Sequence, residues 1–175
     1  FCTTSSYVKS TLCFATADNI EGPYTYVDTI LYSGYGKSNI SETNLYDVLG
    51  KNADISRYLE YGGYNNKEWP NCIDPAIFTD ADGRMWMNYG SWSGGIFLLE
   101  IDPTTGYPIY PVDDKDADPY YGYRLIGGGH HSAEGPYIQY DAENGYYYLF
   151  VSYGDLQSDG GYQIRQFRSE KPTGP

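Results

Sequence analysis

The chain has 175 residues, about the length of one domain, and its 22 tyrosines, 21 glycines and 10 prolines favour short strands joined by tight turns. Its 23 acidic and 11 basic residues give a net charge of −12, which repels phosphate backbones and anionic lipid surfaces. The sequence has no apolar run near the roughly 18 residues that a membrane-spanning helix needs. We therefore expect neither nucleic acid nor a membrane as a partner.

The first predicted strands run over residues 1–7, 11–16 and 24–31. Residues 33–69 then form a polar, irregular stretch, and the apolar spacing within 44–60 is compatible with a short helix. Long loops of this kind are often functional when they lie near a site. The alternative, to which we give equal weight, is that residues 33–69 are an insertion without a functional role.

Two later segments, 74–91 and 134–154, are alike. Each begins with a carboxylate near a proline and continues through a short apolar strand, an acidic turn that ends in glycine, and an aromatic strand. The offset from Asp74 to Glu134 is 60 residues. A third predicted strand follows each segment, at 95–101 and 162–169. This internal repeat predicts successive sheets of the same design.

A strand end followed by Gly-Pro, at 22–23 and again at 174–175, extends the repeat to the first strands. Consecutive antiparallel sheets of about four strands are typical of a β-propeller, and a β-sandwich with coincidental Gly-Pro turns is the alternative. We predict an all-β fold in which residues 1–175 form a partial β-propeller. Its predicted parts are the rest of one blade (1–32), a long loop (33–69), a second blade (70–129) and an incomplete third blade (130–175).

A closed propeller has typically four to eight blades, so about two complete blades and part of a third predict a piece of a longer protein. The chain begins at Phe1 with no initiator methionine or signal region, which predicts a processed or truncated product. Cys2, Cys13 and Cys72 lack the spacing of a disulfide framework or a zinc site. The apolar contexts of Cys2 and Cys13 predict small buried residues.

Asp74 and Glu134 are the candidate catalytic residues. The innermost strand of a propeller blade starts near the central axis, so carboxylates at equivalent strand starts would converge at one end of the channel. Paired carboxylates carry out glycoside hydrolysis, in which one protonates the leaving oxygen and the other activates water or acts as nucleophile. The alternative is that both accept backbone hydrogen bonds as turn residues.

Aromatic side chains favour a sugar ligand, because flat rings bury the apolar faces of sugars. Trp92 lies in a glycine-rich turn that would let a ligand approach the backbone, and Trp69 is expected to line the same opening. His130 and His131 stand just upstream of Glu134. Strand neighbours point to opposite faces, so we expect one histidine at the site and no metal shared by the two.

Segments 73–78, 89–96 and 133–138 resemble glycoside hydrolase family 43, and within it the endo-1,5-α-L-arabinanases and related arabinan-acting members. Segments 149–154 and 160–165 continue the likeness, which covers nearly the whole chain. The motifs are specific for the family, but less so for arabinan over arabinoxylan or xylo-oligosaccharide. By this resemblance we assign substrate binding to Trp92, Ser91, Gly94, Ile73, Trp69, His131 and Arg165.

The resemblance implies a five-bladed propeller, of which the chain supplies about blades two to four, and an inverting mechanism. It implies that Glu134 is the general acid and that Asp74 orients this acid and modulates its pKa. The family's general base, an aspartate at the start of the first blade, lies outside this chain. No cofactor is implied as a requirement, although a structural calcium fits the complete propeller.

We therefore expect a hydrolase of arabinan or arabino-oligosaccharides, outside the cell or in the periplasm because its substrate is a polymer. The alternative is a non-catalytic, carbohydrate-binding propeller fragment. Protein–protein binding by the propeller fits two axial carboxylates less well. The open faces of the first and last sheets predict self-association of the isolated chain.

Overall fold

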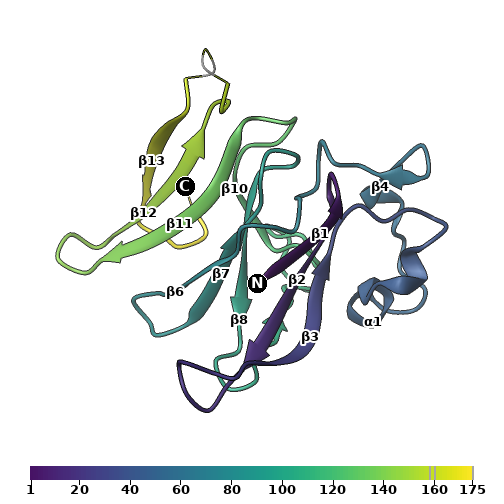
Figure 1. Ribbon diagram of the computed structural model, residues 1–175, viewed down its shortest axis with the longest axis horizontal. Helices are drawn as coiled ribbons and strands as arrows, with labels where there is room; N and C mark the ends of the chain where they lie inside the picture. The colour runs from purple at the N-terminus through teal and green to yellow at the C-terminus, as the bar shows by residue number, and fades with distance from the viewer. Residues whose placement is uncertain (158, 160, 175) are drawn as a thin grey trace.

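The computed structural model describes residues 1–157, 159 and 161–174. Gly160, which belongs to one family-like segment, and Pro175, which ends the second Gly-Pro pair, lie outside the described residues. The described part is nearly all β, with three larger antiparallel sheets in chain order and one two-stranded sheet (Figure 1). We call the larger ones the first, middle and last sheet.

The first sheet has the strand order β1-β2-β3. Its strands are β1 (Cys2–Ser6), β2 (Lys9–Thr16) and β3 (Thr25–Tyr32), which confirms the three strands predicted for this region. Cys13 is buried as expected, but the prediction that Cys2 is buried is wrong. Cys2 lies on β1, the outermost strand of the sheet, which is exposed along its whole length.

Residues 33–69 contain the predicted short helix and further turns of helix and strand. The elements are η1 (Ile40–Glu42), α1 (Leu45–Leu49), η2 (Ser56–Tyr58), β4 (Leu59–Glu60) and β5 (Gly63–Tyr64). Leu45 and Tyr58 are fully buried. The Arg57 guanidinium pairs with Asp118 at 3.2 Å, which ties this segment to the loop before β10. The segment is therefore part of the core rather than a decoration on it.

The middle sheet has the order β10-β8-β7-β6, with β9 also paired to β8. Its strands are β6 (Ala76–Thr79), β7 (Met85–Tyr89), β8 (Ile96–Ile101), β9 (Pro108–Ile109) and β10 (Tyr123–Ile126). Successive side chains of β8 point to opposite faces. Phe97 and Leu99 join the core shared with the first sheet, whereas Ile96 and Leu98 join the core shared with the last sheet. Both faces of this sheet are thus covered.

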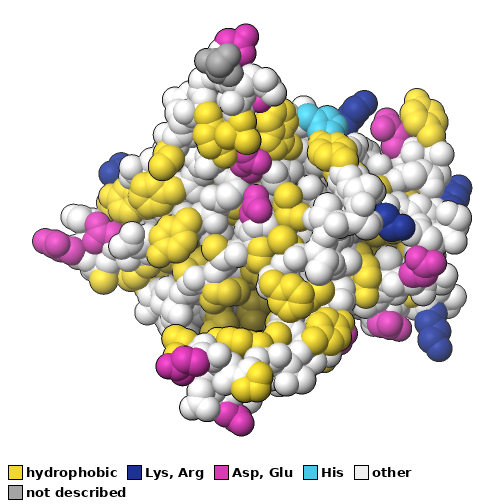
Figure 2. Space-filling view, in the orientation of Figure 1, with side chains coloured by type: hydrophobic (Ala, Val, Ile, Leu, Met, Phe, Trp, Pro, Cys, Tyr) yellow, Lys and Arg dark blue, Asp and Glu magenta, His cyan; other side chains and the backbone are white. Residues whose placement is uncertain are grey.

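The last sheet has the order β11-β12-β13 and one covered face. Its strands are β11 (Ala133–Asp141), β12 (Tyr146–Tyr153) and β13 (Gln163–Ser169). On β12 every second residue is buried, namely Tyr147, Leu149 and Val151. By contrast, β13 is exposed along nearly its whole length. Figure 2 shows apolar side chains over the last sheet and, lower in the view, a hollow with apolar walls between the middle and first sheets.

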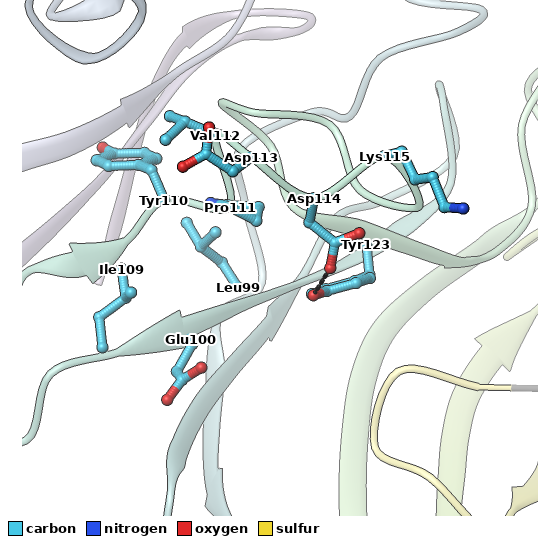
Figure 3. A pocket seen from close by; sticks show the side chains of 10 residues that line it. All are labelled: Leu99, Glu100, Ile109, Tyr110, Pro111, Val112, Asp113, Asp114, Lys115 and Tyr123. Atoms are coloured by element: carbon cyan, nitrogen blue, oxygen red, sulfur yellow. Dashed lines mark hydrogen bonds between the residues drawn. The ribbon is translucent and has the colours of Figure 1, made fainter.

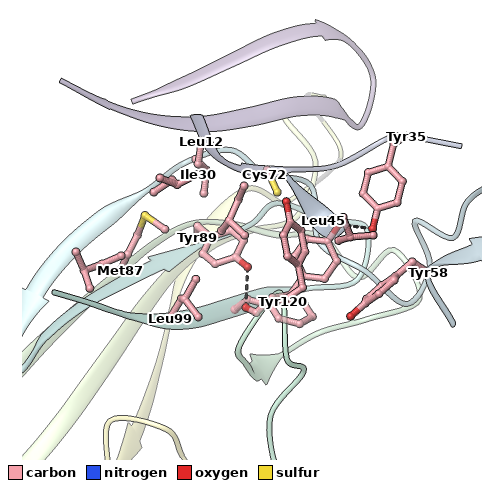
Figure 4. Close-up of a cluster of buried hydrophobic side chains, with 14 of the residues drawn as sticks. Leu12, Ile30, Tyr35, Leu45, Tyr58, Cys72, Met87, Tyr89, Leu99 and Tyr120 are labelled. Carbon is pink, nitrogen blue, oxygen red and sulfur yellow. Dashed lines mark hydrogen bonds between the residues drawn. The ribbon is translucent and has the colours of Figure 1, made fainter. Parts of the chain in front are cut away.

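The core between the first and middle sheets combines leucines and isoleucines with several buried tyrosines (Figure 4). Their hydroxyl groups are hydrogen-bonded within the core. Tyr89 donates to the Tyr121 carbonyl at 2.7 Å, and Tyr58 donates to the Asp118 carboxylate at 3.1 Å. Buried tyrosines are stable only with such partners, because an unpaired buried hydroxyl is costly. Most other tyrosines are exposed or partly buried, so the core accounts for only part of the tyrosine content of the sequence.

Candidate active site

Asp74 and Glu134 come from neighbouring sheets, and the structure brings them together. Asp74 lies two residues before β6 of the middle sheet, and Glu134 is the second residue of β11. The Asp74 Oδ2 atom accepts a hydrogen bond from the backbone N–H of Gly135 at 3.2 Å. Asp74 therefore reaches the residue that directly follows Glu134, and it accepts a backbone hydrogen bond as the alternative interpretation also expected.

The surroundings of Asp74 change its ionisation. Burial raises the pKa of the Asp74 carboxyl above its ordinary value, the N–H of Gly135 acts against this, and the nearby charge of Glu134 adds to the rise. The two carboxyl groups are thus electrostatically linked. A linked pair of carboxyl groups at one end of a fold is a common source of acid–base chemistry.

Hydroxyl groups hold both oxygens of Glu134. Ser91, in the turn between β7 and β8, donates from Oγ to Oε2 at 3.2 Å. Tyr162, directly before β13, donates from its hydroxyl to Oε1 at 2.9 Å. Ser91 was assigned to substrate binding, but its contact here is with the candidate acid. Sequence reasoning missed Tyr162, although it stands inside a family-like segment and directly before the β13 strand that pairs with β12.

Backbone strain gathers at the same place. Asp74, Trp92, Ser93 and His130 all have a positive φ, between 38° and 63°, which non-glycine residues rarely adopt. Two hydrogen bonds hold the turns together, from Trp92 N–H to the Ala133 carbonyl at 2.8 Å and from His130 N–H to the Ser93 carbonyl at 2.9 Å. Strained residues of this kind cluster at active sites and ligand clamps. Three of these four residues are not carboxylates, so the backbone geometry is a second feature that marks this end of the sheets.

Three residues assigned to substrate binding instead contact the backbone and the core around the β7–β8 turn. Gly94 approaches the backbone of Trp69 so closely that a Cβ atom would lie 2.4 Å from its carbonyl carbon. The Trp69 indole N–H donates to the Arg57 carbonyl at 2.7 Å, and its ring stacks on Tyr121 with centroids 5.8 Å apart. The Ile73 carbonyl accepts a hydrogen bond at 2.9 Å from the N–H of Gly90, the residue before Ser91. Trp92 is half-buried and, within the described residues, belongs to neither core cluster.

The two histidines lie in a turn before β11 rather than on a strand, so the expectation based on strand alternation is wrong. His131 is exposed, and Nδ1 of His130 lies 3.4 Å from the Tyr7 hydroxyl of the β1–β2 turn. Arg165 stacks on the ring of Tyr153, 3.4 Å from its centroid. Over the part of the chain that the structure describes, neither a hydrogen bond nor an ion pair joins Arg165 to Asp74 or Glu134.

Within residues 1–157, 159 and 161–174, the structure holds no group of three or more His, Cys, Asp or Glu side chains that could bind a metal ion. No helix among the described residues has the length and apolar character to span a membrane.

A cavity of about 620 Å³ opens elsewhere, at the outer edge of the middle sheet (Figure 3). It lies between β8, β10 and the loop that follows β9, and none of the candidate site residues lines it. The Tyr123 hydroxyl donates to Asp114 at 2.6 Å across its rim. That bond gives the Asp114 carboxylate a structural partner, so the paired carboxylates remain the better candidate site.

Known proteins resemble the chain in sequence and in structure. An extracellular endo-α-(1→5)-L-arabinanase of Thermotoga petrophila is 42% identical over 167 residues, and an extracellular endo-α-(1→5)-L-arabinanase 2 of Bacillus subtilis is also 42% identical over 167 residues. Each match covers 95% of this chain but only 31% and 30% of the relative, so the chain spans about a third of their length.

Solved structures agree with these relatives. The crystal structure of the Thermotoga petrophila endo-1,5-α-L-arabinanase matches with a TM-score of 0.77 and 41% identity, over 99% of this chain and 35% of that one. The family 43 YxiA protein of Bacillus licheniformis matches with a TM-score of 0.76 and 39% identity, over 99% of this chain and 34% of that one. The three sheets are thus part of a five-bladed β-propeller, and the sandwich alternative is excluded. Residues 30–175 match the model of the glycosyl hydrolases family 43, and the chain belongs to that family.

Proposed function

We propose that the complete protein containing this chain hydrolyses α-1,5-linked arabinan or arabino-oligosaccharides outside the cell. Support comes from the relatives, which are named extracellular endo-α-(1→5)-L-arabinanases. A neutral polysaccharide is also compatible with a net charge of −12, which disfavours anionic ligands.

The observation that carries the proposal is the meeting of two carboxylates from neighbouring sheets, with Asp74 bonded to the N–H next to Glu134. In the proposed reaction, Glu134 protonates the oxygen of the leaving sugar. Asp74 orients the Glu134 backbone through Gly135. An aspartate from outside this chain serves as the base and activates water on the opposite side of the sugar ring, as inversion requires. Trp92, held in the strained turn beside them, packs against a sugar face.

The test is Glu134→Gln in the complete protein, because glutamine keeps the side-chain shape but cannot donate the proton. We expect kcat on linear arabinan to fall at least ~10²-fold, as is typical when general acid catalysis is lost. An aryl arabinofuranoside with a good leaving group needs less protonation and should lose less. Glu143→Gln, a surface change in the turn between β11 and β12, is the matched control.

Equal losses on the polymer and on the aryl substrate would contradict the role of Glu134 as acid. A complete wild-type protein that binds arabino-oligosaccharides in calorimetry without hydrolysing them would instead support the non-catalytic, carbohydrate-binding alternative.

A further inference from the structure

The Glu134 carboxylate is held from two sides, by hydroxyl groups that belong to different sheets. The Ser91 contact to Oε2 ties it to the middle sheet, and the Tyr162 contact to Oε1 ties it to the last sheet. Ser91 is 5% exposed and lies next to the strained turn at Trp92, whereas Tyr162 is 45% exposed. The Tyr162 contact at 2.9 Å is the shorter of the two.

The register of the last sheet explains how Tyr162 reaches the carboxylate. Glu134 on β11 pairs with Ser152 on β12, and Ser152 pairs with Ile164 on β13. These three residues form one row across the sheet. Tyr162 stands two residues before Ile164, so alternation places it on the same face of the sheet, one step along from Glu134.

From these contacts we propose that Tyr162 is a positioning residue for Glu134. The inference rests on the function proposed above. The last torsion of a glutamate side chain has a broad, weakly restricted range. Two hydrogen bonds that reach its two oxygens from different directions fix the plane of the Glu134 carboxyl group. Tyr162 and Ser91 together thus present the acid to the leaving oxygen in one orientation.

Positioning of Glu134 differs in its kinetic signature from the two other roles that an exposed tyrosine can have. A direct contact with substrate would change KM, and a purely structural role would act whether or not residue 134 can donate a proton. Positioning instead lowers kcat and has no further effect once Glu134 is replaced.

The experiment compares Tyr162→Phe with Tyr137→Phe in the complete protein. Tyr162→Phe removes only the hydroxyl that contacts Glu134, and Tyr137 is a 52% exposed tyrosine of β11 in the same sheet. For Tyr162→Phe we expect kcat on linear arabinan to fall about tenfold, the equivalent of one hydrogen bond. KM should stay within about twofold. Tyr137→Phe should match the wild type.

Two further variants keep the test decisive. Ser91→Ala removes the other donor and should also lower kcat with little change in KM, which covers the case in which Tyr162→Phe does not fold. In a Glu134→Gln background, Tyr162→Phe should cause no additional loss, because its effect passes through Glu134.

The outcomes distinguish this inference from the proposed function. If Glu134→Gln is inactive but Tyr162→Phe retains the wild-type kcat, the positioning role is overturned and the proposed function stands. A rise in KM with unchanged kcat would also overturn it, in favour of a substrate contact. Full activity of Glu134→Gln would overturn both.

Discussion

The middle and last sheets each carry one of the two carboxylates at matching points of the internal repeat, but they support them differently. The middle sheet is covered on both faces, and Asp74 at its edge is half-buried and bonded to a backbone N–H. The last sheet is covered on one face in this chain, and Glu134 is held by two side-chain hydroxyls. Glu134, on the sheet that is covered on one face, is therefore oriented by side-chain hydrogen bonds rather than by packing from both sides.

The largest difference is expected in folding stability. Leu98 on β8 is fully buried, whereas Ile164 on β13 is 76% exposed. In the 175-residue chain, Leu98→Ala should lower the free energy of unfolding by about 2–5 kcal/mol, because it leaves a cavity in the core. Ile164→Ala should change it by less than about 0.5 kcal/mol. Urea unfolding of both variants measures the contrast.

Equal decreases in the free energy of unfolding for Leu98→Ala and Ile164→Ala in the 175-residue chain would contradict this difference between the two sheets. A large cost of Ile164→Ala that arises only in the complete protein would sharpen it, because it would show that a further part of the protein covers the outer face of the last sheet.

A smaller effect is expected at the turn of the middle sheet that faces Glu134. Trp92→Ala should weaken the binding of arabino-oligosaccharides by roughly 1–3 kcal/mol if the ring packs on a sugar face. Calorimetry on the complete protein measures this affinity, and Tyr61→Ala, a fully exposed aromatic position in the turn between β4 and β5, is the control. Unchanged affinity in a folded Trp92→Ala protein would assign the indole to the support of the turn.

Much of the fold could be predicted because it depends on local patterns. The alternation of β12, the glycine-ended acidic turns and the repeat from Asp74 to Glu134 are visible in the sequence, and the strands lie where these patterns place them. The propeller architecture was predicted from the internal repeat, and the family resemblance added the expectation of five blades. The burial of Cys2 was wrong because an apolar sequence context does not show which strand lies at the edge of a sheet.

The site was predictable in its carboxylates but not in their partners. Trp69 was assigned to the opening, yet its ring stacks on Tyr121, which lies more than fifty residues further along the chain. At His130 the backbone is left-handed, and the sequence does not predict this because a histidine rarely adopts a positive φ. Tyr162 reaches Glu134 only through the register of three strands. All three depend on tertiary contacts between distant segments.

The central claim is that Asp74 and Glu134 act as one catalytic unit. The most direct measurement is kcat on linear arabinan for Asp74→Asn, Glu134→Gln and the double variant of the complete protein. Residues that act as a unit are strongly non-additive, so the double variant should lose about as much activity as Glu134→Gln alone. If the two losses multiply in the double variant, Asp74 does not act through Glu134 and the account is contradicted.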